Sequence, residues 1–548
     1  MRGQYDDPPP CGNRPFHMPP VRGRGPVRHS RGRRLRMKRP LAVVLLLAGL
    51  LSTPTPVASA AAGGDLDRSF GTNGVTKDPA VGVSGRAVAL QSNGRIVVVG
   101  YSGYWAWVYR YRTDGTLDTS FGGGDGRVNI DFGHPTELND VAIQSDGRIM
   151  VVGRTHIAGL SDYYDTAVAR LTSSGDLDTT FRGDGKSVLD LGFRDGADAV
   201  AIAPNGRIVI VGDGLVKLDG DFYVTRLTSS GALDSTFSSN GRTTTGFGGE
   251  NDAALDVAVQ SDGRIVVAGR TDADGEYDYD FAVARYTTSG GLDASFNFDG
   301  KASIGFGDSD EARAVAIQSD GKIVLAGPSD PDDGPSDFAV ARLNAVGLAD
   351  DDWDGDGKIT TGFGGTDDWA EDVLVQPDGR IVVVGRVRTD KLGGPFDLGL
   401  LRYNQSGSLN TSFGGDGKVR TNLGTSDEIY GIARQTDGKL VVAGEVGQGA
   451  DPQLFVARFH WTTDPAPTTT IDSGPSGDTA DTTPTFTFHS NESGAKFECT
   501  VATPYVPCTS PKTFTLAPGS YTFKVRAIDS SAQKDATPAT RSFTILTP

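Results

Sequence analysis

Residues 255–304 read LDVAVQSDGRIVVAGRTDADGEYDYDFAVARYTTSGGLDASFNFDGKASI, and the order of apolar and turn residues in them decides the fold. Leu255, Val257 and Val259 alternate with polar residues, which predicts a β-strand with one buried face. The Asp-Gly pair that ends at Gly263 favours the positive φ of a tight hairpin. The stretch therefore opens with a hairpin, and no helical period follows it.

The second half of the same stretch predicts two further strands. The continuous run Ile-Val-Val-Ala at 265–268 is typical of a strand that is covered on both faces. A third strand begins at Phe281, turns at Gly290, and is followed by a short fourth strand after Gly300. One unit of about 58 residues is thus expected to form a four-stranded sheet, the repeat of a β-propeller.

The unit occurs seven times, and two sequence anchors mark it. The hairpin anchor, of the type SDGRIVVAG, has its first glycine at Gly94, Gly147, Gly206, Gly263, Gly321, Gly379 and Gly438. The second anchor, of the type LDxSF, ends at Phe70, Phe121, Phe181, Phe237, Phe296, Trp353 and Phe413. Seven units are not a multiple of three, so a β-trefoil does not fit.

The two ends of the array complement each other. Residues 66–75 hold only the second half of a unit, and residues 431–459 hold only its first half. An all-β, seven-bladed propeller closed by the N-terminal strand follows, over residues 61–460, since closure removes two unpaired sheet edges. The alternative is a linear β-solenoid, which would need caps rather than complementary half-units.

The paired LDxSF and DGKI anchors resemble those of the delta-60 repeat family of secreted or surface bacterial proteins. The resemblance covers residues 66–460. It implies a propeller-like repeat domain of undefined biochemical role, and it brings no catalytic residues.

An arginine recurs in the VARY or VARL strand of every unit, at Arg110, Arg170, Arg226, Arg285, Arg342, Arg402 and Arg458. In six units an Asp or Asn follows it after the turn, at Asp118, Asp178, Asp234, Asp293, Asp350 and Asn410. Active sites break the symmetry of a repeat, so we expect a structural Arg–Asp pair in each unit rather than an anion-binding ring.

Residues 1–60 have the features of a basic leader and signal peptide. The basic segment at 31–39 precedes eleven apolar residues at 41–51 and a small-residue cleavage site that ends at Ala60. Eleven residues are too few to span a membrane. We therefore expect a secreted protein, extracellular or at the cell surface, with no membrane span after cleavage; whether translation starts at Met1 or Met37 stays open.

The formal net charge of the 548 residues is −17, with 52 Lys and Arg against 69 Asp and Glu. Because 11 of the basic and 2 of the acidic residues lie in residues 1–60, the rest of the chain carries −26. An acidic body excludes nucleic-acid binding, which requires a cationic surface. We expect neutral, cationic or calcium-bridged partners and a monomeric protein.

A Pro/Thr linker at 461–470 leads to residues 471–548, whose sequence does not follow the repeat. Its short alternating strands predict a small β-sandwich. The pattern FEC…PC…GSYTFKVRAID is similar to that of bacterial Ig-like modules, which implies a spacer or an adhesive stalk. Cys499 and Cys508 lie on adjacent predicted strands, so we expect a disulfide, the alternative being two free buried thiols.

Two acidic loops are the candidates for a metal site, although no catalytic His or Cys motif accompanies them. Hard oxygen ligands of this kind suit Ca²⁺. The first loop holds Asp352, Asp354 and Asp356, and the second holds Asp272, Asp274, Asp278 and Asp280. The alternative is that these are solvated acidic turns that keep the protein soluble.

The aromatic residues of the first unit form an unusual group, Tyr101, Tyr104, Trp105, Trp107 and Tyr109. They could stack on sugar rings, or they could fill the junction where the ring closes.

We expect a secreted binding, adhesion or scaffold protein without enzymatic activity, which recognises an extracellular glycan or protein through its propeller loops. The alternative is a calcium-dependent propeller hydrolase or lyase that acts on an extracellular polysaccharide or lactone. An enzyme should place unlike acidic, basic and His groups around one channel mouth, whereas the seven units are nearly identical in sequence.

Overall fold

The computed structural model describes residues 63–547, except for residues 79–81, 104, 158–159, 193–194, 217–218, 250, 273–277, 308, 331–333, 366, 389–393, 448–451, 462–466, 491–494 and 529–533. Every regular element of these residues is a β-strand, as expected for an all-β chain. No helix in this part of the chain is long and apolar enough to cross a membrane. The predictions for residues 1–60, including the signal peptide, lie outside the described residues.

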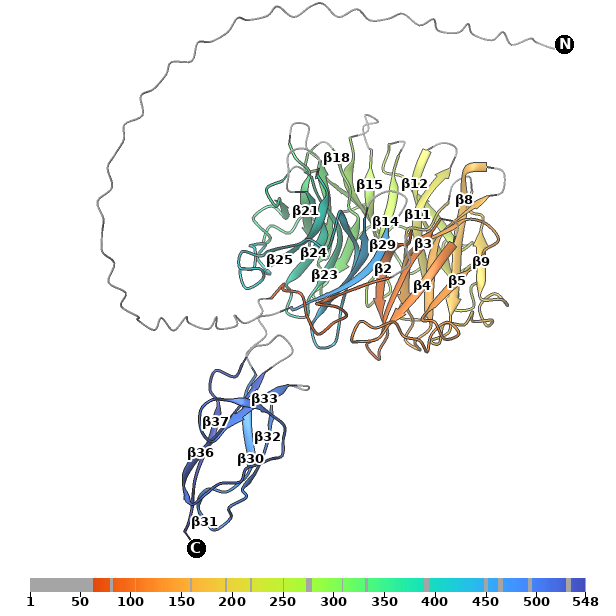
Figure 1. Ribbon diagram of the computed structural model, residues 1–548. Helices are drawn as coiled ribbons and strands as arrows, with labels where there is room; N and C mark the ends of the chain where they lie inside the picture. Colours follow the sequence, from red (N-terminus) through yellow and green to blue (C-terminus); the bar gives the residue numbers. More distant parts are fainter. Residues whose placement is uncertain are drawn as a thin grey trace, which may run out of the picture. The chain divides into compact units, whose positions relative to one another are not determined.

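Seven consecutive sheets, here called blades 1 to 7, form a β-propeller (Figure 1). Blade 1 contains β2 (Ser84–Leu90), β3 (Ile96–Ser102), β4 (Trp105–Tyr111) and β5 (Arg127–Ile130). Blade 2 contains β6 (Thr136–Ile143), β7 (Ile149–Ile157), β8 (Leu160–Leu171) and β9 (Lys186–Leu189). Blade 3 contains β10 (Ala199–Ile202), β11 (Ile208–Val216), β12 (Asp219–Leu227) and β13 (Arg242–Thr245). Blade 4 contains β14 (Ala253–Val259), β15 (Ile265–Thr271), β16 (Asp280–Tyr286) and β17 (Lys301–Ile304).

The remaining blades follow the same antiparallel order with two variations. Blade 5 contains β18 (Ser309–Asp310), β19 (Ala314–Ile317), β20 (Ile323–Asp330), β21 (Asp337–Leu343) and β22 (Lys358–Thr361), and both β18 and β19 pair with β20. Blade 6 contains β23 (Asp368–Val375), β24 (Ile381–Arg388), β25 (Phe396–Tyr403) and β26 (Lys418–Thr421). Blade 7 contains β27 (Asp427–Arg434), β28 (Leu440–Val446), β29 (Gln453–Phe459) and β1 (Val75–Lys77).

Seven hydrophobic clusters hold the blades together, one between each pair of neighbouring sheets. The second strand of each blade is apolar on both faces because it contributes to the clusters on either side, as the run at 265–268 predicts. The first strands of neighbouring blades pack beside one another around the axis of the ring. The sheets themselves remain open, and the ring results from packing between them.

The N-terminal segment supplies the last strand of the last blade. Strand β1 pairs antiparallel with β29, with Thr76 opposite Val456. Phe70 is fully buried in the cluster that joins blade 7 to blade 1, together with Val98 and Val441. The two half-units recognised in the sequence therefore combine into one sheet.

The C-terminal region forms two sheets. One contains β30 (Thr469–Ser473), β32 (Thr485–Ser490) and β35 (Lys512–Thr513), and the other contains β31 (Gly477–Thr479), β37 (Ala539–Ile545), β36 (Gly519–Ile528), β33 (Lys496–Thr500) and β34 (Val506–Cys508). Both contribute to one aromatic core, in which the ring centroids of Phe486 and Phe523 lie 4.1 Å apart. Cys499 and Cys508 form a disulfide across the paired strands β33 and β34, with 6.0 Å between their Cα atoms.

Candidate functional site

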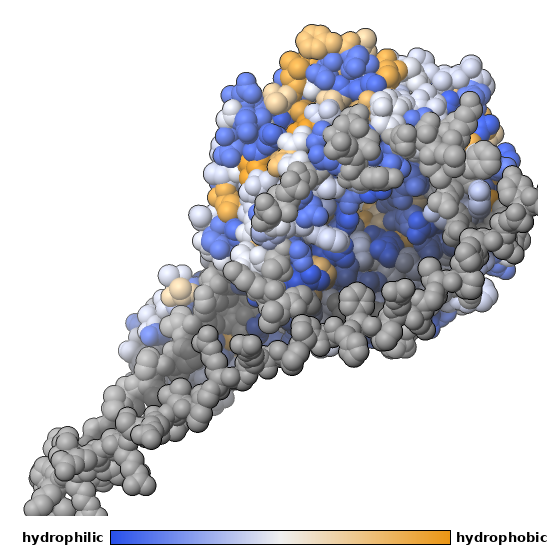
Figure 2. Space-filling view, turned by 90° about the horizontal axis from the view of Figure 1, so that it is seen from above, coloured by the Kyte–Doolittle hydropathy of each residue, from blue (hydrophilic) through white to orange (hydrophobic). Residues whose placement is uncertain are grey.

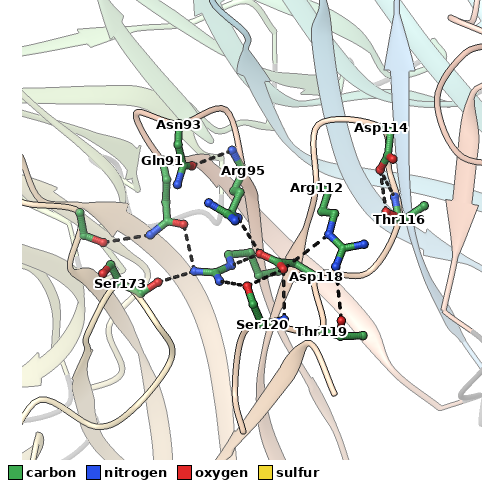
Figure 3. Close-up of polar contacts among 12 residues, drawn as sticks. Gln91, Asn93, Arg95, Arg112, Asp114, Thr116, Asp118, Thr119, Ser120 and Ser173 are labelled. Carbon is green, nitrogen blue, oxygen red and sulfur yellow. Dashed lines mark hydrogen bonds and ion pairs between the residues drawn. The ribbon is translucent and has the colours of Figure 1, made fainter. Parts of the chain in front are cut away.

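The recurrent arginine of each unit lies in a buried polar cluster that brings the two sequence anchors together (Figure 3). In blade 1, Arg110 Nε donates to Asp118 Oδ2 over 2.8 Å. Arg95, from the hairpin anchor, donates to the same oxygen over 2.6 Å, and Ser120 donates to Asp118 Oδ1. Burial alone would raise the pKa of Asp118, but the hydrogen bonds from Ser120 and the two arginines lower it to about 2.

The other blades repeat this cluster, and each arginine also reaches the next blade. The pairs are Arg170–Asp178, Arg226–Asp234, Arg285–Asp293, Arg342–Asp350, Arg402–Asn410 and Arg458–Asp67. In blade 3, Arg226 Nη1 donates to the carbonyl of Thr288 in blade 4 over 2.5 Å, and in blade 7, Arg458 donates to Thr113 in blade 1. The expected structural pair is confirmed, and we call these seven clusters the Arg–Asp ring.

A second repeated feature lies at the opposite end of the first strand, which bulges in five of the seven blades. In blade 4, Leu255 is an extra residue, since Ala254 pairs with Gly269 and Asp256 pairs with Ala268. The same shift occurs in blades 1, 2, 6 and 7. A Cβ at Gly269 would overlap the carbonyl oxygen of Ala253, and the equivalent glycine, the last residue of the hairpin anchor, is present in all seven units.

The bulge corrects one prediction from the sequence. The alternation predicts that Leu255 shares a buried face with Val257, but the buried neighbours of Val257 include Ala254 instead. Leu255 is only partly buried and lines a cavity of about 420 Å³. An extra residue in a strand moves the following side chains to the other face, so a period of two cannot detect it.

The five bulge residues line this cavity, which we call the channel mouth, together with Asp198 and Arg313, which occupy the same position in blades 3 and 5. The seven residues at this bulge position are of six different types. They are Arg86, Asn139, Asp198, Leu255, Arg313, Glu371 and Tyr430. The rest of the lining adds further charged and aromatic groups, Tyr101, Glu137, Arg154, Arg270 and Glu311. Figure 2 shows this end of the ring from above, with hydrophilic residues gathered around the middle of the face. The blades are therefore nearly identical in their framework but differ at the channel mouth.

Ion pairs link the charged groups of the channel mouth from blade to blade. Arg270 of blade 4 donates to Glu311 of blade 5 over 2.8 Å, and Arg313 bridges Glu311 and Glu371 of blade 6, both over 2.6 Å. Glu371 in turn contacts Arg386, which pairs with Glu428 of blade 7. Burial opposes ionisation of Glu311, but Arg313 and Arg270 lower its pKa, so it remains charged.

Aromatic rings flank the arginines of the channel mouth. The guanidinium of Arg86 lies 4.4 Å from the ring centroid of Tyr430 and donates to the hydroxyl of Tyr101 over 2.7 Å. Arg386, which contacts the lining residue Glu371, lies 4.1 Å from the ring centroid of Trp369. Burial raises the pKa of Tyr430, and its hydroxyl donates to Glu428. Tyr430 therefore stays protonated at neutral pH and is poorly suited to act as a general base.

One carboxylate of the channel mouth differs from the others. Burial and the neighbouring Asp213 raise the pKa of Asp198 to about 8, although Arg154 opposes the shift. Asp198 is thus the lining carboxylate whose pKa is raised toward the range that proton transfer requires.

Three aspartates follow the bulge in alternate blades, at Asp140, Asp256 and Asp372. Asp256 accepts one hydrogen bond from the amide of Val257 in its own blade and another from Val315 in blade 5, both over 2.7 Å. Asp140 and Asp372 join blades 2 and 3 and blades 6 and 7 in the same way. Burial raises the pKa of Asp256 to about 7. The three aspartates thus join blades 2 and 3, 4 and 5, and 6 and 7, and because the number of blades is odd, blade 1 has no partner of this kind.

A larger cavity, of about 550 Å³, lies between the hairpin turns of blades 5 and 6. Its lining includes Gln318, Gln376 and Arg342, which occupy positions that most other blades share. Because the lining repeats the framework, this cavity is a weaker candidate for a specific site than the channel mouth.

The sequence singled out other acidic residues, and the structure places them apart from the channel mouth. Asp352, Asp354 and Asp356 lie exposed in the turn between β21 and β22, where Asp356 accepts a hydrogen bond from the amide of Lys358. In the second loop, Asp272 is buried, Asp278 is exposed and Asp280 begins β16, while Asp274 lies outside the described residues. Neither set provides three carboxylates that gather around one point among the described residues, and calcium binding by these loops stays a prediction.

The aromatic residues singled out in blade 1 lie in two different places, some at the surface and some in the junction between blades 7 and 1. Tyr101 lines the channel mouth, and Trp105 is 49% exposed. Tyr109 is buried in the cluster between blades 7 and 1, and Trp107 packs against it. Tyr104 lies outside the described residues.

Comparisons with known proteins support the repeat architecture. Seven segments match the family model described as "Domain of unknown function (DUF5122) beta-propeller", at residues 91–121, 144–181, 203–237, 260–296, 318–351, 376–413 and 435–460. No curated protein matches the chain. The resemblance to the delta-60 repeat family stays a prediction, as does the Ig-like nature of the C-terminal region.

Solved structures resemble the chain only remotely. The extracellular domain of a putative hybrid two-component system from B. thetaiotaomicron is 10% identical with a TM-score of 0.38, and the alignment covers 87% of this chain and 58% of that one. Virginiamycin B lyase from Staphylococcus aureus is 12% identical with a TM-score of 0.41, over 70% and 98% of the two chains. The polysaccharide lyase Uly1 is 12% identical with a TM-score of 0.37, over 72% and 92%. At this distance the likenesses say nothing about ligand or reaction.

Proposed function

We propose that this protein is a secreted binding or scaffold protein without enzymatic activity, and that its ligand is an extracellular carbohydrate bound at the channel mouth. The observation that carries the proposal is the contrast between the similar framework of the seven blades and the six different residue types that they place at the bulge position. A framework needs equal residues, whereas recognition of an asymmetric ligand needs unlike ones.

The chemistry of the channel mouth suits a polar, uncharged ligand. Its lining holds four arginines and four acidic residues, of which Asp198 is mostly protonated at neutral pH, so the lining carries little net charge although the chain as a whole is acidic. Fixed guanidinium and carboxylate groups form paired hydrogen bonds with hydroxyl groups, and aromatic rings such as Tyr101 pack against the apolar faces of sugars. The ion pairs hold these groups in place before a ligand arrives, which reduces the entropic cost of binding.

Binding to a glycan array tests the proposal. We expect the full chain to bind a defined set of neutral glycans, and Arg86→Ala, which removes a guanidinium held between two aromatic rings, to weaken this binding at least tenfold. Arg380→Ala is the control, because Arg380 pairs with Asp378 in the hairpin turn at the other end of blade 6. Equal loss in both variants, or no glycan binding at all, would contradict the proposal.

The alternative is a hydrolase or lyase that acts on a polysaccharide or lactone, and one observation favours it. Asp198 has a raised pKa in the channel mouth and could exchange a proton with a substrate. Asp198→Asn separates the two functions. If the protein only binds, the variant should release no product from any bound glycan, as should the wild type; a wild-type product that disappears in Asp198→Asn would establish the enzyme.

We also propose that the leader directs export and that the C-terminal sandwich is an Ig-like spacer. The disulfide between Cys499 and Cys508 supports an oxidising compartment. N-terminal sequencing of the protein recovered from a culture medium should begin at Ala61. Recovery only from the cytoplasm, with residues 1–60 intact, would argue against export.

A further inference from the structure

Three carboxylates that the sequence did not single out meet at the junction of blades 2 and 3. Asp165 lies in β8, Asp190 follows β9 directly, and Asp195 precedes the first strand of blade 3. One oxygen from each lies within 4.8 Å of the other two. Two ligands of one Ca²⁺ can lie that far apart, since each Ca–O bond is about 2.3–2.6 Å long.

The buried member of the group has an oxygen that no described group satisfies. Asp195 is 1% exposed, and its Oδ2 accepts a hydrogen bond from the amide of Leu191. Its Oδ1 is buried without a hydrogen-bond donor among the described residues, and so is Oδ1 of Asp165. An unsatisfied buried carboxylate oxygen is costly. Asp252, Asp310 and Asp427, at the position of Asp195 in blades 4, 5 and 7, also keep one such oxygen. In blade 2 a second unsatisfied oxygen, on Asp165, and a third carboxylate lie beside it, and this combination indicates a bound cation.

No described side chain neutralises this group. Arg242 acts on Asp195 from a distance but forms no ion pair with any of the three in the described part of the chain. Burial raises the pKa of Asp195 to about 7, and the charges of Asp165 and Asp190 add to the shift. Asp190 is exposed, which leaves one side of the group open to water.

Blades 3 to 6 carry a different residue at the position of Asp190 and therefore lack the third carboxylate. The residue that follows the fourth strand is Gly246, Gly305 and Gly362 in blades 3, 4 and 5. In blade 6 it is Asn422, which donates to Asp397 over 2.6 Å, and Arg420 also donates to Asp397. Blade 6 thus neutralises Asp397, the counterpart of Asp165, with protein groups, whereas blade 2 adds a negative charge.

We propose that Asp165, Asp190 and Asp195 bind a Ca²⁺ ion that joins blade 2 to blade 3. The ligands are all oxygen atoms, which excludes a preference for zinc, and the open side admits the waters that complete six to eight ligands. The site is also close in sequence to residues at the channel mouth. Tyr164, whose ring centroid lies 5.2 Å from Arg154, precedes Asp165, and Asp198 follows Asp195 by three residues.

Calorimetric titration of the chelator-treated full chain with CaCl₂ tests the proposal. Extracellular calcium modules bind with Kd of about 10⁻⁴–10⁻³ M, and we expect one such site. Asp190→Gly, which copies the residue of blades 3 to 5, and Asp195→Asn should each raise Kd about tenfold or more. Asp190→Gly should fold, because three blades carry glycine there.

Asp131→Gly is the matched control, since Asp131 follows the fourth strand of blade 1 but has Trp105 and Thr136 where blade 2 has Asp165 and blade 3 has Asp195. It should bind Ca²⁺ like the wild type. The proposal is overturned if the wild type binds no Ca²⁺ at about ten times the weakest expected Kd, or if Mg²⁺ binds equally well. It is also overturned if Asp190→Gly binds normally while Asp352→Asn does not, which would place the ion in the loop predicted from the sequence.

Discussion

The Arg–Asp ring and the channel mouth lie on the same seven blades, and both are rich in arginine and carboxylate groups. In the Arg–Asp ring six blades use the same Arg–Asp pair and blade 6 uses Arg402–Asn410, and the spare donors of the arginine go to the next blade. In the channel mouth the bulge residue changes from blade to blade, and its ion pairs form an irregular chain. Arginine and carboxylate groups therefore hold the blades together where every blade has similar residues, and we infer that they recognise a ligand where the residues differ between blades.

Deleting residues 63–78 should have the largest effect on the framework. The deletion removes β1, the buried ring of Phe70 and Asp67, the partner of Arg458. Blade 7 would lose its outer strand and keep an unpaired buried arginine, so we expect loss of cooperative thermal unfolding by circular dichroism. Deleting residues 1–60 alone should leave the unfolding transition unchanged. A stable propeller without residues 63–78 would show that the N-terminal half-unit is dispensable.

Acid should weaken the Arg–Asp ring in all blades except blade 6. Burial alone would raise the pKa of Asp234, but Thr236 and the two nearby arginines lower it to about 2, below the ordinary value of 3.8. A lowered pKa in the folded state stabilises the protein above the unfolded pKa, and this contribution is lost as the pH falls from about 4 to about 2. Urea unfolding at pH 5, 3 and 2 measures the loss. Asp234→Asn, which copies Asn410, should flatten the dependence.

Arg226→Ala should destabilise the propeller by about 3–5 kcal/mol, because it removes the buried guanidinium that bonds Asp234 and the carbonyl of Thr288 and leaves only the partly exposed Arg207 as a charged partner of the carboxylate. Arg285→Ala should cost about the same, since blade 4 repeats the contacts of blade 3. The exposed pair Arg380–Asp378 is the control and should contribute about 0–1 kcal/mol. Urea unfolding of the three variants checks the order, and very different losses in blades 3 and 4 would show that the ring is not an equal framework.

Asp256→Ala should cost less, about 1–3 kcal/mol, because it leaves the amides of Val257 and Val315 without an acceptor. Ala199 and Ala314 occupy the same position in neighbouring blades without such a role. Ala314→Gly, which copies Gly431, is therefore a control that should cost about 1 kcal/mol or less. Chemical denaturation measures both, and an equal loss would argue that Asp256 does not join blades 4 and 5.

The sequence predicts the framework well because local chemistry determines it. Turn glycines such as Gly263, whose φ is 86°, and the LDxSF anchor mark each blade, and both anchors meet in the Arg–Asp ring. The sequence also predicts that each arginine is structural. It does not predict which carbonyl of the next blade accepts the arginine, because that contact depends on how the sheets pack.

The channel mouth could not be predicted from the same pattern. Leu255 lies in an alternating run, and only the backbone pairing shows that it is an extra residue. The signal was nevertheless present, since the glycine that ends every hairpin anchor permits the bulge. The Asp165, Asp190 and Asp195 group was missed because two connections of different length bring it together, whereas the predicted calcium loops relied on spacing within a single turn.

The central claim is that the channel mouth recognises the ligand while the Arg–Asp ring only supports it. Glycan binding and thermal unfolding of Arg86→Ala and Arg226→Ala, measured side by side with the wild type, test this most directly. We predict that Arg86→Ala loses at least tenfold in affinity with an unchanged melting temperature, and that Arg226→Ala melts earlier but binds normally below its melting temperature. Normal binding by Arg86→Ala, or a selective loss of binding by folded Arg226→Ala, would contradict the claim.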